Sequence, residues 1–471
     1  MKHPSRLLRF VGALLASATL GALSGAAQNN PSTDPFPDFG YMTNANTSPA
    51  FQLSQDYPKT KPPLTEIPKF FALLPPKFGP DFELWRPYMM AIRDYCFEGN
   101  TTTGWVVQNN PVRKWYHIPW QHYGGSGREG FHGLTKEAPV QPNQLAIGQG
   151  QPAPNDFYQT YAVGFFNSFG GYRIGQVWAD HMKPNLATGD GFPEGTVICK
   201  LLFVDVPTSQ VPFLVNPIQW QAYIQQTYFN INRYVGTVSL IQMDIAVRDS
   251  RAPLGWIMGT FQYNGALNNS DPWKNLIPVG VMWGNDPTIT DSNYTNPQPT
   301  VTKINPNLKE TAINANTKEL PPTHLGWNGR LNGPVDNPQS SCISCHMTAE
   351  VPQTSPMSPL FLPKSEQPAV GSTAWMRWFQ NDKCGSVFDE GSQSADFSLQ
   401  LSEGIANFNE WNAPNWAGLF AVNYPPVSGS GSTAAKAAPA AKATLKAEKA
   451  PAKKPVKKIY PVVRGATPEG K

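Results

Sequence analysis

Two thiols and an imidazole stand close together at Cys342, Cys345 and His346, in the run Cys-Ile-Ser-Cys-His. Two thiols at this spacing can each form a thioether to one edge of a porphyrin, and the imidazole that follows then lies under the iron. The spacing is the attachment pattern of a c-type haem. The sequence therefore predicts one covalently attached haem c, with His346 as the proximal iron ligand.

Paired thiols also occur in zinc sites and in disulfides. A zinc site needs further cysteines or histidines at matching spacing, and the chain has no second pair of this kind. A redox dithiol is expected near a βαβ pattern, whereas the residues before the motif are rich in Asn, Pro and Ser. A disulfide between Cys342 and Cys345 remains the simplest alternative to haem attachment.

Residues 1–27 are typical of a secretory signal, with a basic start, an apolar core at 10–23 and small residues at 24–27. The apolar core is short for a membrane span, and no later stretch is long enough. Haem attachment to paired cysteines takes place outside the cytoplasm, so the signal and the motif agree. We expect a protein of the bacterial periplasm, without a transmembrane segment once the signal is removed.

Charge and composition divide the rest of the chain. The whole chain carries a net charge of +4, but its basic residues are concentrated in the signal and in residues 428–471. This Ala-, Lys- and Pro-rich tail is expected to be disordered. Residues 28–427 are therefore mildly acidic, which argues against nucleic acid as a partner. We divide them into an N-terminal extension, residues 28–150, packed on a haem c domain, residues 151–427.

Short aromatic and β-branched runs between Gly and Pro predict the strands of an antiparallel sheet. These runs are 157–166, 172–178, 195–206, 236–247 and 255–263. Helical patterns are few, and helices are expected at 82–97, 217–229 and 397–408. The predicted fold class is α+β, a mostly antiparallel sheet packed against the haem, with long irregular loops.

A competing architecture is an all-helical cytochrome c domain at 340–425, joined to an unrelated β domain. Such a domain would place a helix just before the motif. The prolines Pro334 and Pro338 stand there instead, so we favour the haem on the sheet.

The other cysteines and three histidines carry weaker signals. Cys199 lies in an apolar run and is expected to be a buried thiol, whereas Cys96 and Cys384 could pair in an oxidising compartment. Histidines among Trp and Tyr could line a pocket or a second metal site, and these are His117, His122 and His132. Their irregular spacing favours an aromatic-rich structural loop.

Three charged residues stand where a strand should be apolar. Lys200 lies within Val-Ile-Cys-Lys-Leu-Leu-Phe, Asp244 lies in the middle of the run at 236–247, and Arg173 lies near the start of the run at 172–178. Lysine is almost never fully buried without a partner. The sheet face either meets a polar cofactor pocket or is wetted by solvent, as one face of an antiparallel sheet often is.

Three blocks of the sequence resemble the cytochrome P-460 and cytochrome c-prime-beta family, in the family's order. They are 192–200, 243–250 with Gly255-Trp256 and the strand of Phe261 after it, and the Cys-x-x-Cys-His motif that follows. The resemblance covers roughly residues 157–350 and implies a mono-haem c protein with a mostly antiparallel sheet. Some members of the family oxidise hydroxylamine at a haem cross-linked to a lysine. Close relatives without that cross-link bind nitric oxide.

The resemblance assigns a role to each charged residue. Lys200 matches the haem cross-linking position, Asp244 matches a distal acid that moves protons, and Arg173 matches a pocket arginine. The acid is a glutamate in the hydroxylamine oxidisers, so the shorter Asp244 could leave its oxygens out of reach of an iron-bound substrate. The segments before residue 157 and at 264–340 have no counterpart in the short members.

The sequence and the resemblance together predict an exported haem c redox protein that oxidises hydroxylamine or a related small nitrogen compound. Its electrons would pass to a soluble or membrane partner. One alternative is a pure electron carrier, with a sixth iron ligand from Met347, Met357 or Met376. Another is a haem protein that binds nitric oxide without turnover.

Overall fold

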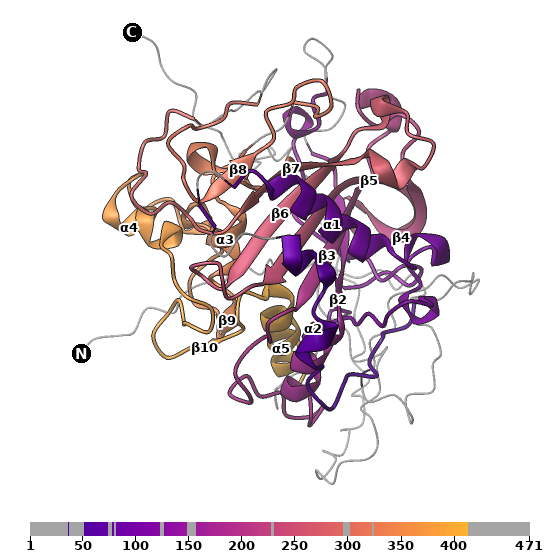
Figure 1. Ribbon diagram of the computed structural model, residues 1–471, viewed down its shortest axis with the longest axis vertical. Coiled ribbons are helices and arrows are strands. Elements are labelled where there is room, and N and C mark those ends of the chain that lie inside the picture. The colour runs from indigo at the N-terminus through magenta and orange to yellow at the C-terminus, as the bar shows by residue number, and fades with distance from the viewer. Residues whose placement is uncertain are drawn as a thin grey trace, which may run out of the picture. The chain divides into compact units, whose positions relative to one another are not determined.

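A single large sheet of eight strands forms the centre of the fold, and all its neighbouring strands pair antiparallel (Figure 1). The order is β1-β2-β3-β5-β6-β7-β8, with β4 also paired to β5. The strands are β1 Thr135–Lys136, β2 Thr160–Phe166, β3 Val197–Val204, β4 Gln219–Thr227, β5 Asn230–Arg248, β6 Trp256–Tyr263, β7 Leu276–Met282 and β8 Thr311–Ile313. A second, two-stranded sheet pairs β9 Glu350–Val351 with β10 Gln393–Ser394. The fold is thus mainly antiparallel β with few helices, which confirms the α+β prediction.

The computed structural model describes residues 36, 51–73, 78–79, 82–122, 127–147, 157–227, 230–294, 302–322 and 325–412. All of these belong to one unit, residues 1–427. The predicted signal, the predicted tail and the expected boundary at residue 150 lie outside the described residues.

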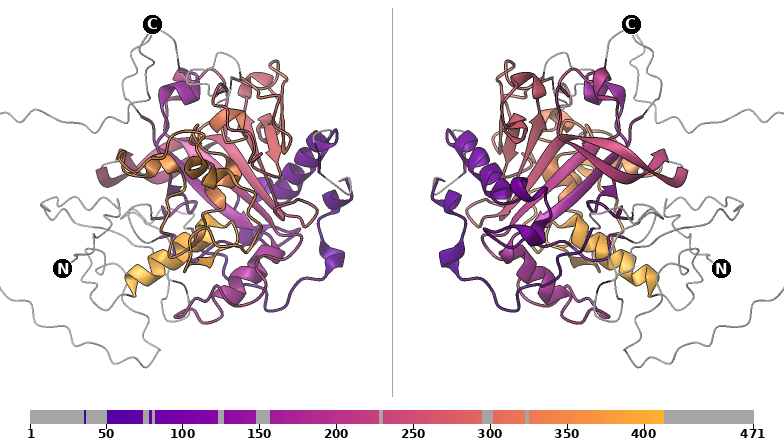
Figure 2. Two further views of the ribbon diagram at one scale, coloured as in Figure 1. Left: turned by 90° about the vertical axis from the view of Figure 1, so that its left-hand side faces the viewer. Right: turned by 90° about the vertical axis from the view of Figure 1, so that its right-hand side faces the viewer.

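Helices lie on both faces of the sheet. They are α1 Trp85–Phe97, α2 Ser168–Val177, α3 Cys342–His346, α4 Thr373–Met376 and α5 Leu399–Trp411. Figure 2 shows α1 on one side of the sheet and the chain from α3 to α5 on the other. Successive strand residues point to opposite faces, so each face has its own core. Gly259 on β6 faces α1, where an added Cβ would lie 2.6 Å from Cε of Met89. Thr260 therefore faces the side of α3.

Two predicted elements are wrong, and tertiary packing explains both. The run at 172–178 lies in helix α2, not in a strand. Asn167 caps this helix by accepting a hydrogen bond from the backbone N–H of Gly170. The glycines of α2 allow close packing, since a Cβ at Gly171 would lie 2.4 Å from the ring of Tyr116.

The run at 217–229 holds strand β4 instead of a helix. Ala222 and Ile224 are fully buried, whereas Gln221 is exposed and Tyr223 is half-buried, which is the alternation of a strand. Pairing with β5 selects the strand, because local helical preference is too weak to oppose a ladder of this length. The predicted helices at 82–97 and 397–408 are confirmed as α1 and α5.

The proposed pairing of Cys96 with Cys384 is also wrong, since all five cysteines are free thiols in this structure. Cys96 is a buried residue of α1, beside the thiol of Cys199, whose pKa is raised first by burial and then by Cys96. Cys384 lies next to Gly255 and Arg248. Cys199 is fully buried, as predicted.

The free state of Cys384 predicts that C384S changes the free energy of unfolding by less than about 1 kcal/mol, with or without reductant, because no cross-link is lost. Loss of a native disulfide would cost about 2–5 kcal/mol, and only in the oxidised protein. Urea unfolding of both proteins under both conditions measures this difference. A cost of that size would restore the rejected pairing.

Candidate functional site

The short helix α3 carries the Cys-x-x-Cys-His motif and begins with a reciprocal cap. The hydroxyl of Ser341 accepts from the backbone N–H of Ser344 at 3.0 Å, and the Ser344 hydroxyl accepts from the Ser341 N–H at 2.7 Å. This capping box satisfies two backbone donors and starts the helix at Cys342. The Ser341 hydroxyl also donates to Oδ1 of Asn285 at 2.6 Å, which ties α3 to the loop after β7.

The two thiols and the imidazole share one face of α3. Positions i, i+3 and i+4 are neighbours on a helix surface, so Cys342, Cys345 and His346 point the same way. All three are half-buried, whereas Ile343 and Ser344 are buried on the other side. The motif is thus presented as two free thiols and one imidazole on a single surface.

A backbone carbonyl orients the imidazole. Nδ1 of His346 lies 2.8 Å from the carbonyl oxygen of Phe397. A carbonyl can only accept, so Nδ1 carries the proton and the lone pair remains on Nε2. The backbone of Asp396 and Phe397 is in the left-handed region, with φ +52° and +66°, and this conformation positions the carbonyl. Such strain in non-glycine residues is maintained where the surroundings enforce it, often at functional sites.

A polar row crosses the sheet on the face toward α3. Lys200 on β3 lies directly opposite Asp244 on β5, and Asp244 lies opposite Thr260 on β6. Glycines continue the row at both ends, Gly164 beside Lys200 and Gly280 beside Thr260. An added Cβ at Gly164 would lie 2.3 Å from the Gln400 side chain of α5, and one at Gly280 would meet Leu331 at 3.0 Å, so both neighbours reach close to the sheet.

Lys200 forms an ion pair with Glu137, a residue of the N-terminal extension. Its Nζ lies 3.3 Å from a carboxylate oxygen of Glu137, and the two side chains are 30% and 32% exposed. Burial is the largest influence and lowers the pKa of Lys200. Attraction to Glu137, Asp244 and Asp336 outweighs it, so the pKa lies above the ordinary value. Lys200 is therefore an ammonium ion near neutral pH.

The side chain of Gln242 holds the carboxylate of Asp244. Nε2 of Gln242 lies 2.8 Å and 3.0 Å from its two carboxylate oxygens. Burial raises the pKa of Asp244 to about 7, and the charge of Asp336 adds to this effect. Lys200, Thr260 and Gln242 oppose the rise. A carboxyl group with this pKa can both bind and release a proton at neutral pH.

The motif helix and the polar row share one neighbourhood. After burial, the charges of Asp244 and Asp336 raise the pKa of Cys342 further. Burial raises the pKa of Cys345 to about 11 and lowers the pKa of His346, and the charge of Lys200 lowers both pKa values. Such effects between charges are largely screened beyond about 10 Å. The structure thus brings together five predicted residues, namely Cys342, Cys345, His346, Lys200 and Asp244.

The same five side chains are partly accessible although burial is the largest influence on each of their pKa values. Partial burial of this kind is not expected of fully solvated charges on a wet sheet face.

Arg173 is placed elsewhere. It lies on α2, is buried, and donates to the carbonyl oxygens of Leu186, at 2.8 Å, and Thr188. Burial lowers the pKa of Arg173, and the charges of Asp396 and Asp190 partly restore it. Its guanidinium thus stabilises the loop after α2. Among the described residues it makes no hydrogen bond or ion pair with Lys200 or Asp244.

Two further residues of the site were not predicted. Asp336 stands in the Asn- and Pro-rich loop before the motif, and Glu137 stands in the N-terminal extension. Neither belongs to a predicted strand or a motif. Only long-range packing places them beside Asp244 and Lys200.

The three predicted histidines lie in separate aromatic contacts. His117 packs against Phe51 and Phe165, with ring centroids 5.0 Å and 5.3 Å away, and its Nδ1 accepts from the Ser54 N–H. The His122 ring lies 5.1 Å from Trp120, and the His132 ring stacks on Trp220 at 4.2 Å. In the part of the chain that the structure describes, no group of three or more His, Cys, Asp or Glu is arranged to hold a metal ion.

The three methionines considered as a sixth iron ligand differ in burial and contacts. The sulfur of Met347 is buried and accepts from the Asn285 amide at 3.6 Å. Met376 is buried in the core on the α3 side of the sheet, and Met357 is 40% exposed.

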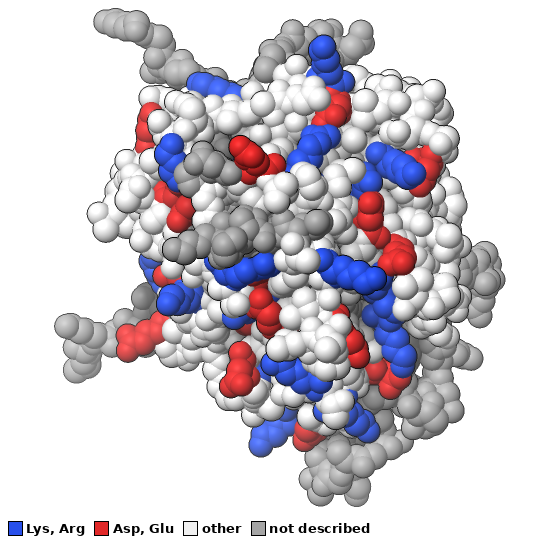
Figure 3. Space-filling view, viewed as in Figure 1, with Lys and Arg blue, Asp and Glu red and all other residues white. Residues whose placement is uncertain are grey.

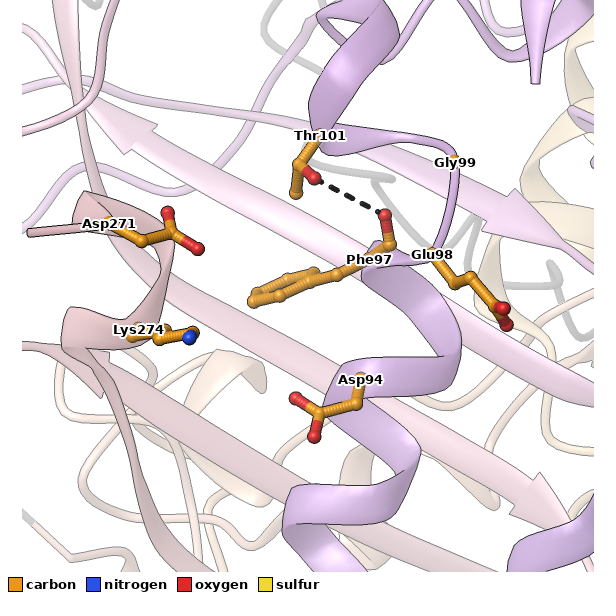
Figure 4. A pocket seen from close by; sticks show the side chains of 7 residues that line it. All are labelled: Asp94, Phe97, Glu98, Gly99, Thr101, Asp271 and Lys274. Carbon is orange, nitrogen blue, oxygen red and sulfur yellow. Dashed lines mark hydrogen bonds between the residues drawn. The ribbon is translucent and has the colours of Figure 1, made fainter. Parts of the chain in front are cut away.

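A surface pocket lies at the end of α1 (Figure 4), and α1 is on the other side of the sheet from α3 (Figure 2). It holds about 200 Å³ and is lined by Asp94, Phe97, Glu98, Gly99, Thr101, Asp271 and Lys274. Two of its carboxylates already have arginine partners, since Asp94 pairs with Arg93 and Glu98 with Arg113. On this face, Lys and Arg are intermixed with Asp and Glu (Figure 3). The pocket is therefore separate from the motif.

Comparison of the chain with protein-family models, with curated proteins and with solved structures found no match. Within the described residues, none of the helices has both the length and the apolar character that a membrane crossing requires.

The raised pKa of Asp244 predicts a pH-dependent stability. The native state binds this proton more tightly than the unfolded chain does, so stability is highest near pH 4 and falls as the pH rises through about 7. D244N should remove this component, on the order of 4 kcal/mol between pH 4 and pH 8. Denaturant unfolding of both proteins across this range measures it. Parallel pH profiles would contradict the assignment.

Proposed function

We propose that the chain is an exported mono-haem c-type cytochrome, with the haem attached through Cys342 and Cys345 and with Nε2 of His346 as the proximal iron ligand. The observation that carries this proposal is the geometry of α3, which presents both free thiols and an imidazole whose Nδ1–H is held by a backbone carbonyl. Metal-ligating histidines usually make this second hydrogen bond, which fixes the tautomer.

The residues around α3 fit such a group. The thiols are accessible enough to react, and neither has formed a disulfide in this structure. The polar row faces α3 and supplies a cation at Lys200 and a proton-exchanging carboxyl at Asp244. When bound, a haem of this type would supply electron transfer and a coordination position for a small molecule. Asp244 would hold or accept a proton at that molecule, and Lys200 would balance the negative charge.

The substrate that these groups suit best is hydroxylamine or a related small nitrogen compound, because its oxidation releases protons as well as electrons. The protons need an acceptor such as Asp244, and the electrons would pass to a soluble or membrane partner. The protein would then act as a haem-dependent oxidoreductase in the periplasm.

A second candidate function, nitric-oxide binding without turnover, is favoured by the ion pair of Lys200 with Glu137. A lysine must lose its proton before its nitrogen can attack a carbon atom of a haem. The ion pair with Glu137 keeps Lys200 protonated. The pure electron carrier has less support, because the sulfur of Met347 already accepts a hydrogen bond and Met357 is exposed.

The attachment is tested by cysteine variants of the exported full-length protein. Wild type should carry the mass of one haem after denaturation, and C342S with C345S should carry none, because both thioethers are lost. C384S is the matched control and should retain the haem. Mass spectrometry with a reduced and an oxidised absorption spectrum gives the answer. A wild-type chain that reaches the periplasm without covalent haem would refute the proposal.

The state of Lys200 is tested on the haem peptide of the same protein. We expect a proteolytic fragment that joins the haem to Cys342 and Cys345 alone, with the Lys200 peptide released unmodified. E137Q removes the anion that stabilises the ammonium, so any lysine adduct should appear first in that variant. A Lys200-haem adduct in wild type would instead favour the hydroxylamine-oxidising type with its cross-link.

A further inference from the structure

One buried amide holds two carboxylates at the site. Gln242 on β5 is fully buried, and its Nε2 donates to Asp244 at 2.8 Å and 3.0 Å and to Asp336 at 3.1 Å. The Oε1 of Gln242 accepts from the backbone N–H of Val335 at 3.4 Å. The side chain of Gln242 therefore joins the middle of the sheet to the loop before the motif. Both carboxylates accept hydrogen bonds from its single amide nitrogen.

The loop that carries Asp336 is shaped for this contact. The Asp336 N–H donates to the carbonyl of Gly333 at 3.1 Å, and the Gly333 N–H donates to the Asp336 carboxylate at 3.1 Å. A Cβ at Gly333 would lie 2.1 Å from Nε2 of Gln242, so only glycine permits this approach. Gln144 of the N-terminal extension donates to the carbonyls of Val335 and Asp336, at 3.0 Å and 2.9 Å.

Two carboxylates that share one amide nitrogen, in a partly dehydrated site, cannot both ionise without a cost, so Asp244 is expected to retain a proton near neutral pH. The other groups that act on Asp244 are few. Lys200 faces it from β3 with Glu137 behind it, and Thr260 faces it from β6. The thiols of α3 lie within range of the same charges.

We propose that Asp336 is a positioning residue for Asp244, and that Asp244, bridged to Asp336 by Gln242, holds one exchangeable proton beside α3. A proton released by a small ligand at the site would pass to ionised Asp244, and a proton needed by the ligand would leave protonated Asp244. The role of the ligand in this inference rests on the proposed function. The exchangeable proton of Asp244 is a property of the chain itself.

The test is a pH titration of the carboxylic acid C=O stretch by infrared spectroscopy, on the full-length protein as isolated. Wild type should show a band that titrates near neutral pH and is absent in D244N. D336N should lower its midpoint by about one pH unit or more, because a like charge is removed. D336E should restore the midpoint.

A substitution of Lys200, the positively charged neighbour of Asp244, should shift the midpoint in the opposite direction and so makes the test specific. K200Q should raise the midpoint, because a cation that favours the ionised form is lost. D94N, on the far side of the sheet, should leave it unchanged. General damage to the fold would not shift the midpoint in opposite directions in D336N and K200Q.

An unchanged midpoint in D336N and K200Q, or the lack of any band that titrates near neutral pH, would overturn the inference. Haem content measured on the same samples separates this failure from failure of the proposed function. If the protein carries covalent haem but Asp244 does not titrate as expected, only this inference is refuted. If Asp244 titrates as expected but the protein carries no haem, the proposed function is refuted.

Discussion

The fold is constrained by opposite charges at the centre of a sheet. Lys200 and Asp244 face each other across two antiparallel strands, where burial disfavours the charged form of each. A buried charge is tolerated only when partners compensate it. Here the partners come from separate parts of the chain, Glu137 before the sheet, Thr260 on the next strand and Asp336 just before the motif. The long irregular segments are folded around this requirement.

A network of hydrogen bonds holds the loops that carry the motif. Asn285 accepts from the cap of α3, and its own backbone N–H donates to Asn381 at 2.8 Å. Arg330 donates to the carbonyl of Asn285 at 2.7 Å and lies 4.7 Å from the ring of Trp327. Burial lowers the pKa of Arg330 to about 10. Its hydrogen bonds to backbone carbonyls and its contact with the Trp327 ring compensate for the water that the guanidinium lacks. A five-residue helix has little stability by itself, and this network supplies it.

The N-terminal extension belongs to the site in this arrangement. Its strand β1 pairs with β2, and the residue after β1 is Glu137, the partner of Lys200. Its Gln144 holds the turn of Asp336. A segment without a counterpart in the short cytochromes of the resembled family thus adjusts the charge and position of two residues that the proposed function needs. This difference bears on whether Lys200 would react with the proposed haem or stay an ion-pair partner of Glu137.

The sequence by itself determined the local features. The motif spacing follows from the reach of two side chains, and four strands, β2, β3, β5 and β6, follow from aromatic and β-branched runs between glycines and prolines. It also singled out Lys200 and Asp244, because a charge inside an apolar strand is visible without a structure. Tertiary structure decided the rest. Packing made α2 a helix and β4 a strand against their local patterns, and it turned Arg173 away from the site. It also brought Glu137 and Asp336 to the polar row, because contacts between residues far apart in sequence depend on how the whole sheet and its loops assemble.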